Sequence, residues 1–315
     1  MKKALVLGAS GGMGFALVEE LVSRNIPTIA FARSQKKLEE FKYEWGPLAE
    51  IYAGDVMNSS HLKEAISKAD YVFHSLNIPY EKWDPTLFTM LQNILNECQN
   101  QNKPFIYVDN IYAYGRQARK VTEEAEKNPH TKKGKFRLKL QKEIEQSGVP
   151  YIIAHFPDFY GPKAESTLLQ YTFEQCLKKN SAGFVGYTTI QKEFIYTKDG
   201  AKALVELALR DYTYNQTWNI AGAGTITGEE VVKIASKHLN KDIKVIPIHK
   251  WMIRLLGIFN PSMKEVVEMM YLNEVPVILD SSKYEREVGP LPKTPYEIGI
   301  VENLHELSKE SLVEV

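Results

Sequence analysis

Residues 8–14 read Gly8-Ala9-Ser10-Gly11-Gly12-Met13-Gly14, and this stretch decides the fold. It directly follows the apolar run 4–7 and precedes the amphipathic stretch 13–24, whose apolar residues recur at helical spacing. Glycine lets the chain turn sharply and lets its backbone approach a pyrophosphate. The N-terminus of the next helix offers free N–H groups to that anion. The order strand, glycine loop, helix therefore predicts a dinucleotide site, with binding residues Gly8, Ser10, Gly11, Gly12, Met13 and Gly14.

The same stretch also fits the pattern G-x-S-x-G, the nucleophile elbow of α/β-hydrolases. A hydrolase elbow sits in the middle of the sheet, after several strands, whereas this loop follows the first strand. We therefore interpret Ser10 as a loop residue beside a pyrophosphate and not as a nucleophile.

Outward from the loop, short apolar runs alternate with helical patterns. The apolar runs lie at 4–7, 27–32, 50–53, 71–74, 105–108 and 151–156, and the helical patterns at 13–24, 62–68, 85–101 and 134–147. Nearly continuous apolar strands that alternate with helices indicate a parallel sheet covered on both faces. Right-handed crossovers then predict an α/β fold, a Rossmann-type doubly wound sheet of six or seven strands.

The pattern becomes less regular after Gly161-Pro162. We expect a dinucleotide-binding domain at 1–160 and a smaller, mixed substrate-binding portion at 161–315, partly interleaved with the sheet. Its expected helices lie at 167–179, 198–210, 228–239, 250–257 and 264–271, and its expected strands at 194–196, 218–221 and 243–247.

Composition excludes several classes of protein. The 315 residues carry 39 Lys and Arg against 39 Asp and Glu, so we expect neither a nucleic-acid nor a membrane partner. The two cysteines rule out a disulfide scaffold and favour a cytoplasmic location. The first apolar run is too short for a signal peptide, and the histidines lack metal-ligand spacing. A small-molecule substrate is the expected partner, and a homodimer is compatible with the sequence.

The residues after the second strand predict which dinucleotide binds. An acid there would accept the ribose 2′-OH of NAD, whereas an arginine accommodates the 2′-phosphate of NADP. The chain has Arg33 and Ser34 at this point, with Lys37 nearby and no acid before Glu39. We therefore predict NADP rather than NAD. The alternative is that Ser34 caps a helix and the lysines are solvated. Asp55, after the third strand, is expected to accept from the adenine amino group or, equally well, to form a turn.

At this point the chain resembles a known family, the extended or atypical short-chain dehydrogenase/reductases, also described as NAD-dependent epimerase/dehydratase-like. The resemblance covers nearly the whole chain and rests on the joint order of its motifs. These are the glycine loop at 8–14, Val108–Gly115 ending in Tyr-Gly, His155–Pro162, Phe194–Ala201, Trp218–Gly222, Asp280–Lys283 with Val288-Gly289, and Thr294–Gly299.

The resemblance also implies an active site, from which this chain departs. The family places Ser or Thr four residues before the Tyr of Tyr-Gly, where this chain has Asn110, and then uses Tyr-x-x-x-Lys. The first register puts Lys133 and Arg137 at those two positions, and a second register gives Lys135 and Lys139. Arginine holds a ribose or phosphate but carries no proton near neutrality. The expected site residues are Asn110, Tyr114, Lys133 and Arg137, with Tyr112 as another phenol close by.

These residues imply an NAD(P)-binding oxidoreductase or epimerase-like protein that acts on a small carbonyl, hydroxyl or sugar-derived compound. The alternative is a non-catalytic NADP-binding regulator or redox sensor. The altered Tyr/Lys pair favours the regulator, whereas the elaborated C-terminal portion favours the enzyme.

Overall fold

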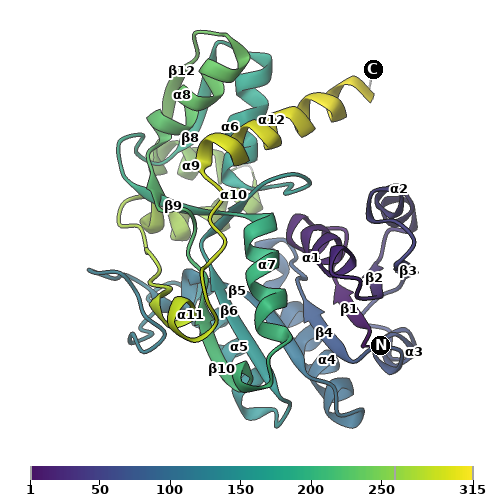
Figure 1. Cartoon of the computed structure of the whole chain (residues 1–315). Coiled ribbons are helices and arrows are strands. Elements are labelled where there is room, and N and C mark those ends of the chain that lie inside the picture. Colours follow the sequence, from purple (N-terminus) through teal and green to yellow (C-terminus); the bar gives the residue numbers. More distant parts are fainter. Residues whose placement is uncertain (1, 259, 314–315) are drawn as a thin grey trace.

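A seven-stranded parallel sheet forms the centre of the molecule in the computed structural model, which describes residues 2–258 and 260–313. Its order is β10-β6-β5-β4-β1-β2-β3 (Figure 1). The bounds are Ala4–Leu7 (β1), Thr28–Ala32 (β2), Ala49–Ala53 (β3), Tyr71–His74 (β4), Phe105–Asn110 (β5), Tyr151–Phe156 (β6) and Gln216–Asn219 (β10). Every pairing in this sheet is parallel. The predicted doubly wound fold is confirmed.

Helices cover both faces of the sheet because its strands are apolar on both sides. Every residue of β1 and β2 is buried. The helices α1 (Gly12–Ser23) and α7 (Thr197–Ala208) pack against each other on one face, and α3 (Ser59–Ser67), α4 (Phe88–Asn100) and α5 (Lys132–Gln146) adjoin in turn on the other (Figure 1). The order of the strands reverses between β1 and β4, and ligands bind at such a point, beyond the carboxyl ends of the strands.

The C-terminal part builds a second core of its own. Leu169, Phe173, Phe184, Val231 and Ile300 belong to this separate apolar cluster. It is assembled from the helices α6 (Leu168–Lys178), α8 (Gly228–Leu239) and α12 (Tyr296–Val313) and two small sheets, β8 (Ser181–Val185) with β12 (Lys244–Ile248), and β11 (Thr225–Ile226) with β9 (Lys192–Tyr196) and β7 (Asp158–Tyr160). The chain returns to the main sheet through α7 and β10, so the two cores share one continuous backbone.

The segment between β12 and the last helices forms a wall beside the carboxyl ends of the strands. It comprises α9 (Lys250–Leu256), α10 (Pro261–Val267) and the 3-10 turn η5 (Glu268–Asn273), and is followed by α11 (Ser282–Glu287). The expectation of one helix at 264–271 is wrong, because α10 ends at Val267 and the chain tightens into η5. The strand β8 and the helix α12 were not expected, and α2 (Gln35–Trp45) corresponds to the alternative in which Ser34 caps a helix.

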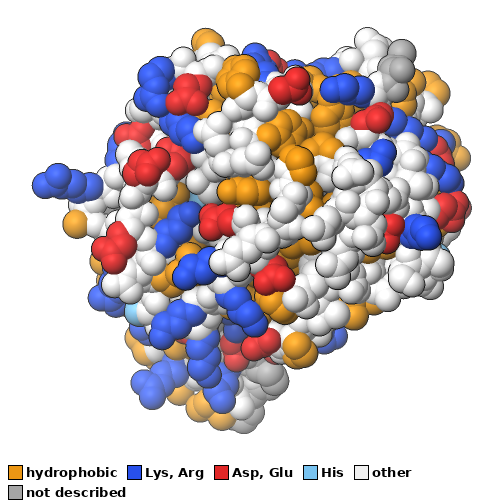
Figure 2. Space-filling view, turned by 90° about the horizontal axis from the view of Figure 1, so that it is seen from below, with side chains coloured by type: hydrophobic (Ala, Val, Ile, Leu, Met, Phe, Trp, Pro, Cys, Tyr) orange, Lys and Arg blue, Asp and Glu red, His pale blue; other side chains and the backbone are white. Residues whose placement is uncertain are grey.

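The face seen in Figure 2 carries side chains of both charges. Lys and Arg gather toward one side of this face, with Asp and Glu among them, in keeping with the net charge of zero. Among the described residues, no helix has the length and apolar character needed to cross a membrane.

Candidate functional site

A cavity of about 620 Å³ opens where the strand order reverses. The glycine loop forms one wall, and the residues that follow β2, β4 and β5 form the floor. Arg137 from α5, Asp158 from β7 and the η5 residues Met269 and Leu272 close the far end. Five of the predicted loop residues line this cavity: Gly8, Ser10, Gly11, Gly12 and Met13.

The close packing of the loop explains why it needs glycines. Gly8 has a φ of +88°, which few other residues adopt. A Cβ at Gly14 would lie 2.1 Å from the Gly8 carbonyl oxygen, so any side chain there would force the turn open. Gly14 therefore shapes the loop from behind and does not line the cavity.

A segment from beyond β7 lies against the loop from the other side. A Cβ on Gly12 would stand 2.4 Å from the Cα of Ala164. Residues 164–168 line the cavity opposite the loop. At its mouth, Lys37 Nζ and Glu165 Oε1 form an ion pair of 2.6 Å. The cavity is thus bounded by both halves of the chain.

Of the residues predicted to bind the adenosine end of the cofactor, two line the cavity and two do not. Arg33 and Lys37 line the cavity, and exposed Arg33 has no ion pair within the described part of the chain. Ser34 instead caps α2, accepting a hydrogen bond from the Lys37 backbone N–H at 3.3 Å. Asp55 accepts from the backbone N–H of Met57 at 2.9 Å and does not line the cavity. The turn interpretation of Asp55 fits this hydrogen bond, and the adenine contact stays a prediction.

Two phenols and an amide meet at the end of β5. The Asn110 side chain accepts a hydrogen bond from the Tyr112 backbone N–H at 3.0 Å and thereby begins the 3-10 turn η3 (Ile111–Tyr114). The Tyr112 hydroxyl lies 2.7 Å from that of Tyr80, which comes from the loop after β4. All three residues line the cavity.

Tyr114 points away from this site, so its predicted place near the reacting atoms is wrong. Its hydroxyl donates to Asn219 Oδ1 at 2.8 Å and lies 3.3 Å from His155 Nδ1. The side chain is fully buried and does not line the cavity, and burial raises the pKa of its hydroxyl. Tyr112 and Tyr114 lie two residues apart on the 3-10 turn η3, so their side chains point in different directions. Tyr112 lines the cavity, and Tyr114 packs beneath the turn.

Lys133 is likewise turned away from the cavity. Its ammonium pairs with Glu265 and lies 5.7 Å from the centroid of the Tyr80 ring. The backbone N–H groups of Lys132 and Lys133 each donate to Glu268 at 3.0 Å. Lys133 therefore fastens α5 to the wall formed by α10 and η5. The second register is wrong as well, since Lys135 and Lys139 are exposed.

Arg137 does reach the cavity, as predicted. Its guanidinium donates to the Tyr107 hydroxyl at 2.9 Å and to Asp109 Oδ1 at 3.3 Å, and lies 4.3 Å from the centroid of the Trp83 ring. Burial raises the pKa of Asp109, and the Arg137 charge opposes that rise. The buried Nε–H of Arg137 has no hydrogen-bond partner among the described residues. One donor of this fixed cation is thus unsatisfied within the described part of the chain.

Four further polar residues near the cavity received no role in the sequence analysis: Tyr80, Asp158, Lys192 and Asn273. Burial raises the pKa of Asp158 and lowers that of Lys192 to about 8. The Lys192 ammonium donates to the Val185 carbonyl at 2.7 Å and to the Asn273 side chain. Asp158 lies in a motif that was noticed, but nothing in the sequence placed Tyr80 or Asn273 beside it.

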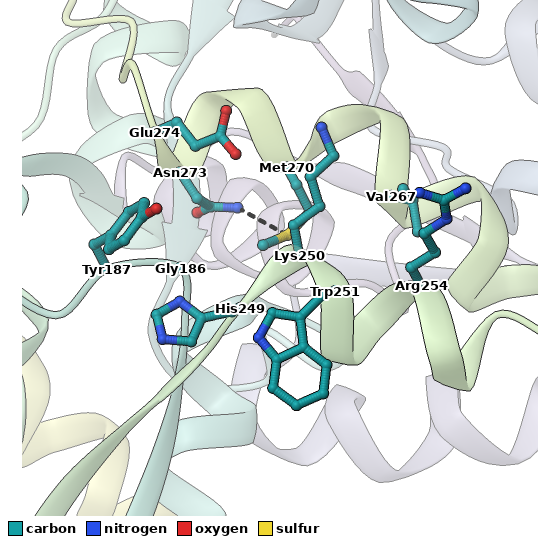
Figure 3. A pocket seen from close by; sticks show the side chains of 10 residues that line it. All are labelled: Gly186, Tyr187, His249, Lys250, Trp251, Arg254, Val267, Met270, Asn273 and Glu274. Carbon is teal, nitrogen blue, oxygen red and sulfur yellow. Dashed lines mark hydrogen bonds between the residues drawn. The ribbon is translucent and has the colours of Figure 1, made fainter.

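A second pocket, of about 420 Å³, lies on the other side of η5 (Figure 3). Met269 and Leu272 face the first cavity, Val267 and Met270 face the second, and Asn273 lines both. Figure 3 shows the Asn273 amide directed at the Met270 sulfur, to which it donates at 3.4 Å. Tyr187 and Trp251 stand exposed at the rim. The described residues contain no group of three or more His, Cys, Asp or Glu that could hold a metal ion.

Comparisons with known proteins agree with this geometry. The model of a family described as NAD(P)H-binding matches residues 8–176. An uncharacterized protein of Saccharomyces cerevisiae is 23% identical over 252 residues, 78% of this chain and 83% of its own length. A UDP-N-acetyl-alpha-D-glucosaminuronate decarboxylase of Bacillus cytotoxicus is 24% identical over 181 residues, 52% of this chain and 56% of its own.

Solved structures match almost the whole chain. A UDP-glucuronic acid 4-epimerase from Bacillus cereus, in complex with NAD, superposes with a TM-score of 0.81 at 17% identity and covers 98% of this chain and 99% of its own. A dTDP-glucose 4,6-dehydratase from Bacillus anthracis, also with NAD, gives a TM-score of 0.80 at 16% identity, covering 99% and 98%. At these identities the likeness establishes the fold.

Proposed function

Because the chain belongs to the NAD(P)H-binding family, we propose that it is an NADP-dependent oxidoreductase or epimerase-like enzyme. The resemblance to extended short-chain dehydrogenase/reductases is confirmed by the family match and by the full-length likeness to an epimerase and a dehydratase. The proposed substrate is a small carbonyl or hydroxyl compound, derived from a sugar. The sugar-nucleotide substrates in the names of the relatives support this class.

One observation carries the proposal: a single cavity runs from the glycine loop to Asn110, Tyr112 and Arg137. The loop fits a dinucleotide, because its glycines carry no side chains and a pyrophosphate can approach the backbone closely. A bound nicotinamide would supply or take a hydride. Gly11 and Gly12 would bind the pyrophosphate at the start of α1, and the free Nε–H of Arg137 would hold a ribose hydroxyl or phosphate.

NADP is proposed over NAD on the charges at the adenosine end. Arg33 and Lys37 line this end, and Glu165, an acid that lines the cavity beside them, is paired with Lys37. An unpaired guanidinium can bind a 2′-phosphate through two parallel hydrogen bonds. We also propose a reducing, cytoplasmic location, which the free, buried Cys98 and Cys176 support.

The test has two parts, binding and turnover. Calorimetry with NADPH and NADH on the full chain should show binding of both, with NADPH the tighter. A panel of carbonyl compounds, sugar nucleotides included, should then give NADPH oxidation or, for an epimerase, an isomerised product at constant cofactor. If NADPH binds and no member of a broad panel is converted, the enzyme proposal fails and the non-catalytic regulator takes its place.

A further inference from the structure

We propose that Tyr112 is the proton donor of this cavity, with Arg137 as its cation and Tyr80 as the hydroxyl that restores its proton. The inference rests on the proposed function and names the catalytic group for it. The tyrosine expected at the start of α5 is absent, and Lys133 stands in its place. A phenol and a cation line the same cavity nonetheless, but the phenol comes from η3 and the cation from α5.

Geometry places Tyr112 where a substrate oxygen could reach it. Tyr112, Tyr80, Asn110 and Arg137 all line the same cavity. The two hydroxyls are 2.7 Å apart, so one of them donates to the other and the second proton is free for a ligand. Asn110 fixes the turn by accepting from the Tyr112 backbone, and its own amide remains available to a substrate carbonyl.

The competing groups are engaged elsewhere. Lys133 is bound to Glu265 outside the cavity, and Tyr114 donates to Asn219 beneath the turn. Arg137 faces the cavity, but a guanidinium stays protonated in proteins and cannot give up a proton. Among the phenols of the described chain, Tyr80 and Tyr112 are the two that line this cavity.

Burial and two charges of opposite sign act on the two hydroxyls. Burial raises the pKa of both hydroxyls, so both are protonated at neutral pH. The nearby Asp158 carboxylate raises these pKa values further, and the Arg137 guanidinium lowers them. The Asp158 carboxylate therefore destabilises the phenolate that forms during the reaction, and the Arg137 guanidinium stabilises it. Arg137 supplies the positive charge that makes the transfer less costly.

The step balances as follows. The carbonyl carbon takes a hydride from the reduced nicotinamide and the C=O π bond breaks, while the substrate oxygen takes the hydroxyl proton of Tyr112. The Tyr112 oxygen then takes the proton of Tyr80 across their hydrogen bond, and the Tyr80 oxygen regains one from solvent at the open cavity. In the direction of oxidation each transfer runs backwards.

The first experiment measures turnover. Tyr112→Phe removes only the hydroxyl, and general acid–base help is worth roughly 10²–10⁴ in rate. We expect kcat to fall at least about tenfold with an unchanged KM for NADPH, and the solvent deuterium isotope effect to disappear. Tyr80→Phe should give a smaller loss. Tyr114→Phe is the matched control, a buried phenol whose hydroxyl faces away, and should leave kcat within about twofold.

The second experiment needs no turnover. The full chain is labelled with 3-fluorotyrosine, and the fluorine resonances of Tyr80, Tyr112 and Tyr114 are assigned by the three Phe variants. Addition of NADPH should shift the resonances of Tyr80 and Tyr112 and leave that of Tyr114 in place. If Tyr112 does not respond while calorimetry shows NADPH bound, the inference is overturned.

The two proposals can fail separately. A shifted Tyr112 resonance in a chain that converts no substrate rejects the enzyme and, with it, the donor role. Turnover that is the same in wild type and Tyr112→Phe leaves the enzyme standing and overturns Tyr112 as the donor.

Discussion

Arg33 is the side chain that we propose to select between the two nicotinamide dinucleotides. It is exposed, lines the cavity, and has no ion pair within residues 2–258 and 260–313. We predict that Arg33→Ala weakens NADPH binding by about 1.5–3 kcal/mol, the cost of a charge-assisted bidentate contact, and hardly changes NADH binding. Calorimetry with both cofactors measures this. Lys36→Ala, a neighbouring exposed cation outside the cavity, is the control, and equal losses for both cofactors in Arg33→Ala would refute the prediction.

Glu193 is a residue through which pH should act on stability. It accepts hydrogen bonds from the backbone N–H groups of Leu279 at 2.9 Å and Gly222 at 3.3 Å. Burial raises its pKa from 4.5 to about 7, so between these pH values the folded chain keeps a proton that the unfolded chain has lost. The free energy of unfolding should fall as pH rises through this window, by on the order of 3 kcal/mol from this group.

Denaturant unfolding of wild type and Glu193→Gln across that window tests the assignment. Glutamine cannot ionise, so the variant should lose this part of the slope. Parallel curves for the two proteins would show that another group is responsible.

For single residues, the sequence predicted roles that follow from the adjoining residues in the chain. It missed side-chain positions that are set by contacts with residues distant in the sequence. Gly8, Gly11, Gly12 and Arg33 follow directly from their positions beside β1 and β2, and all four line the cavity. Tyr114 and Lys133 were assigned from family spacing, which does not report the direction of a side chain on a 3-10 turn or at a helix start. Tyr80 begins a short 3-10 turn, η1 (Tyr80–Lys82), in the connection after β4, and no local pattern in the sequence signals its place beside Tyr112.

At the scale of elements, the start of α5 and the wall η5 depend on each other. Glu268 accepts from two backbone N–H groups in the first turn of α5, where a negative charge is favourable. We predict that Glu268→Ala destabilises the protein by about 1–2 kcal/mol, the usual cost of a lost helix cap, and raises the KM for substrate because Met269 and Leu272 are displaced. Thermal unfolding and steady-state kinetics measure the two effects.

The control for this prediction is Glu274→Ala. Glu274 follows η5 and lines the second pocket, and it makes no ion pair within the described part of the chain. A similar loss of stability in both variants would mean that the contact with α5 is unimportant.

The sequence predicted helices and strands correctly where apolar residues form a continuous or periodic pattern. It missed elements that form only because a segment distant in the sequence pairs with them. The apolar runs 4–7, 71–74 and 151–156 are the strands β1, β4 and β6, bound for bound. Strand β8 (Ser-Ala-Gly-Phe-Val) has little intrinsic β preference and forms because β12 pairs with it and Gly183 leaves room for Tyr171 and Ile248. In α12, the buried residues Ile300 and Leu304 lie among the charged residues Glu297, Glu302 and Glu306, which obscure the apolar stripe.

At the scale of the whole molecule, the two cores meet across the cavity, and Lys37 with Glu165 bridges its mouth. A 2′-phosphate bound at Arg33 would stand near the Glu165 carboxylate and compete with it for Lys37. We predict that Glu165→Gln tightens NADPH binding severalfold, by about 0.5–1 kcal/mol, without a matching gain for NADH. Calorimetry at low and at high salt checks it, because the gain should shrink with screening. An equal gain for both cofactors would count against the 2′-phosphate.

The close packing of Ala164 against Gly12 bears on how fast the cofactor can exchange relative to substrate turnover. The segment that carries Ala164 lies over the turn that would hold the pyrophosphate, so a dinucleotide in this cavity is held under chain from the other half of the molecule. We expect departure of the cofactor to require movement of that segment, whereas exchange of a small substrate does not. We expect long residence of the cofactor, with many substrates passing through for each exchange. Slow cofactor exchange suits a reaction that gives the hydride back to the product within the same turnover. It would limit the rate of a reaction that consumes one cofactor molecule per turnover.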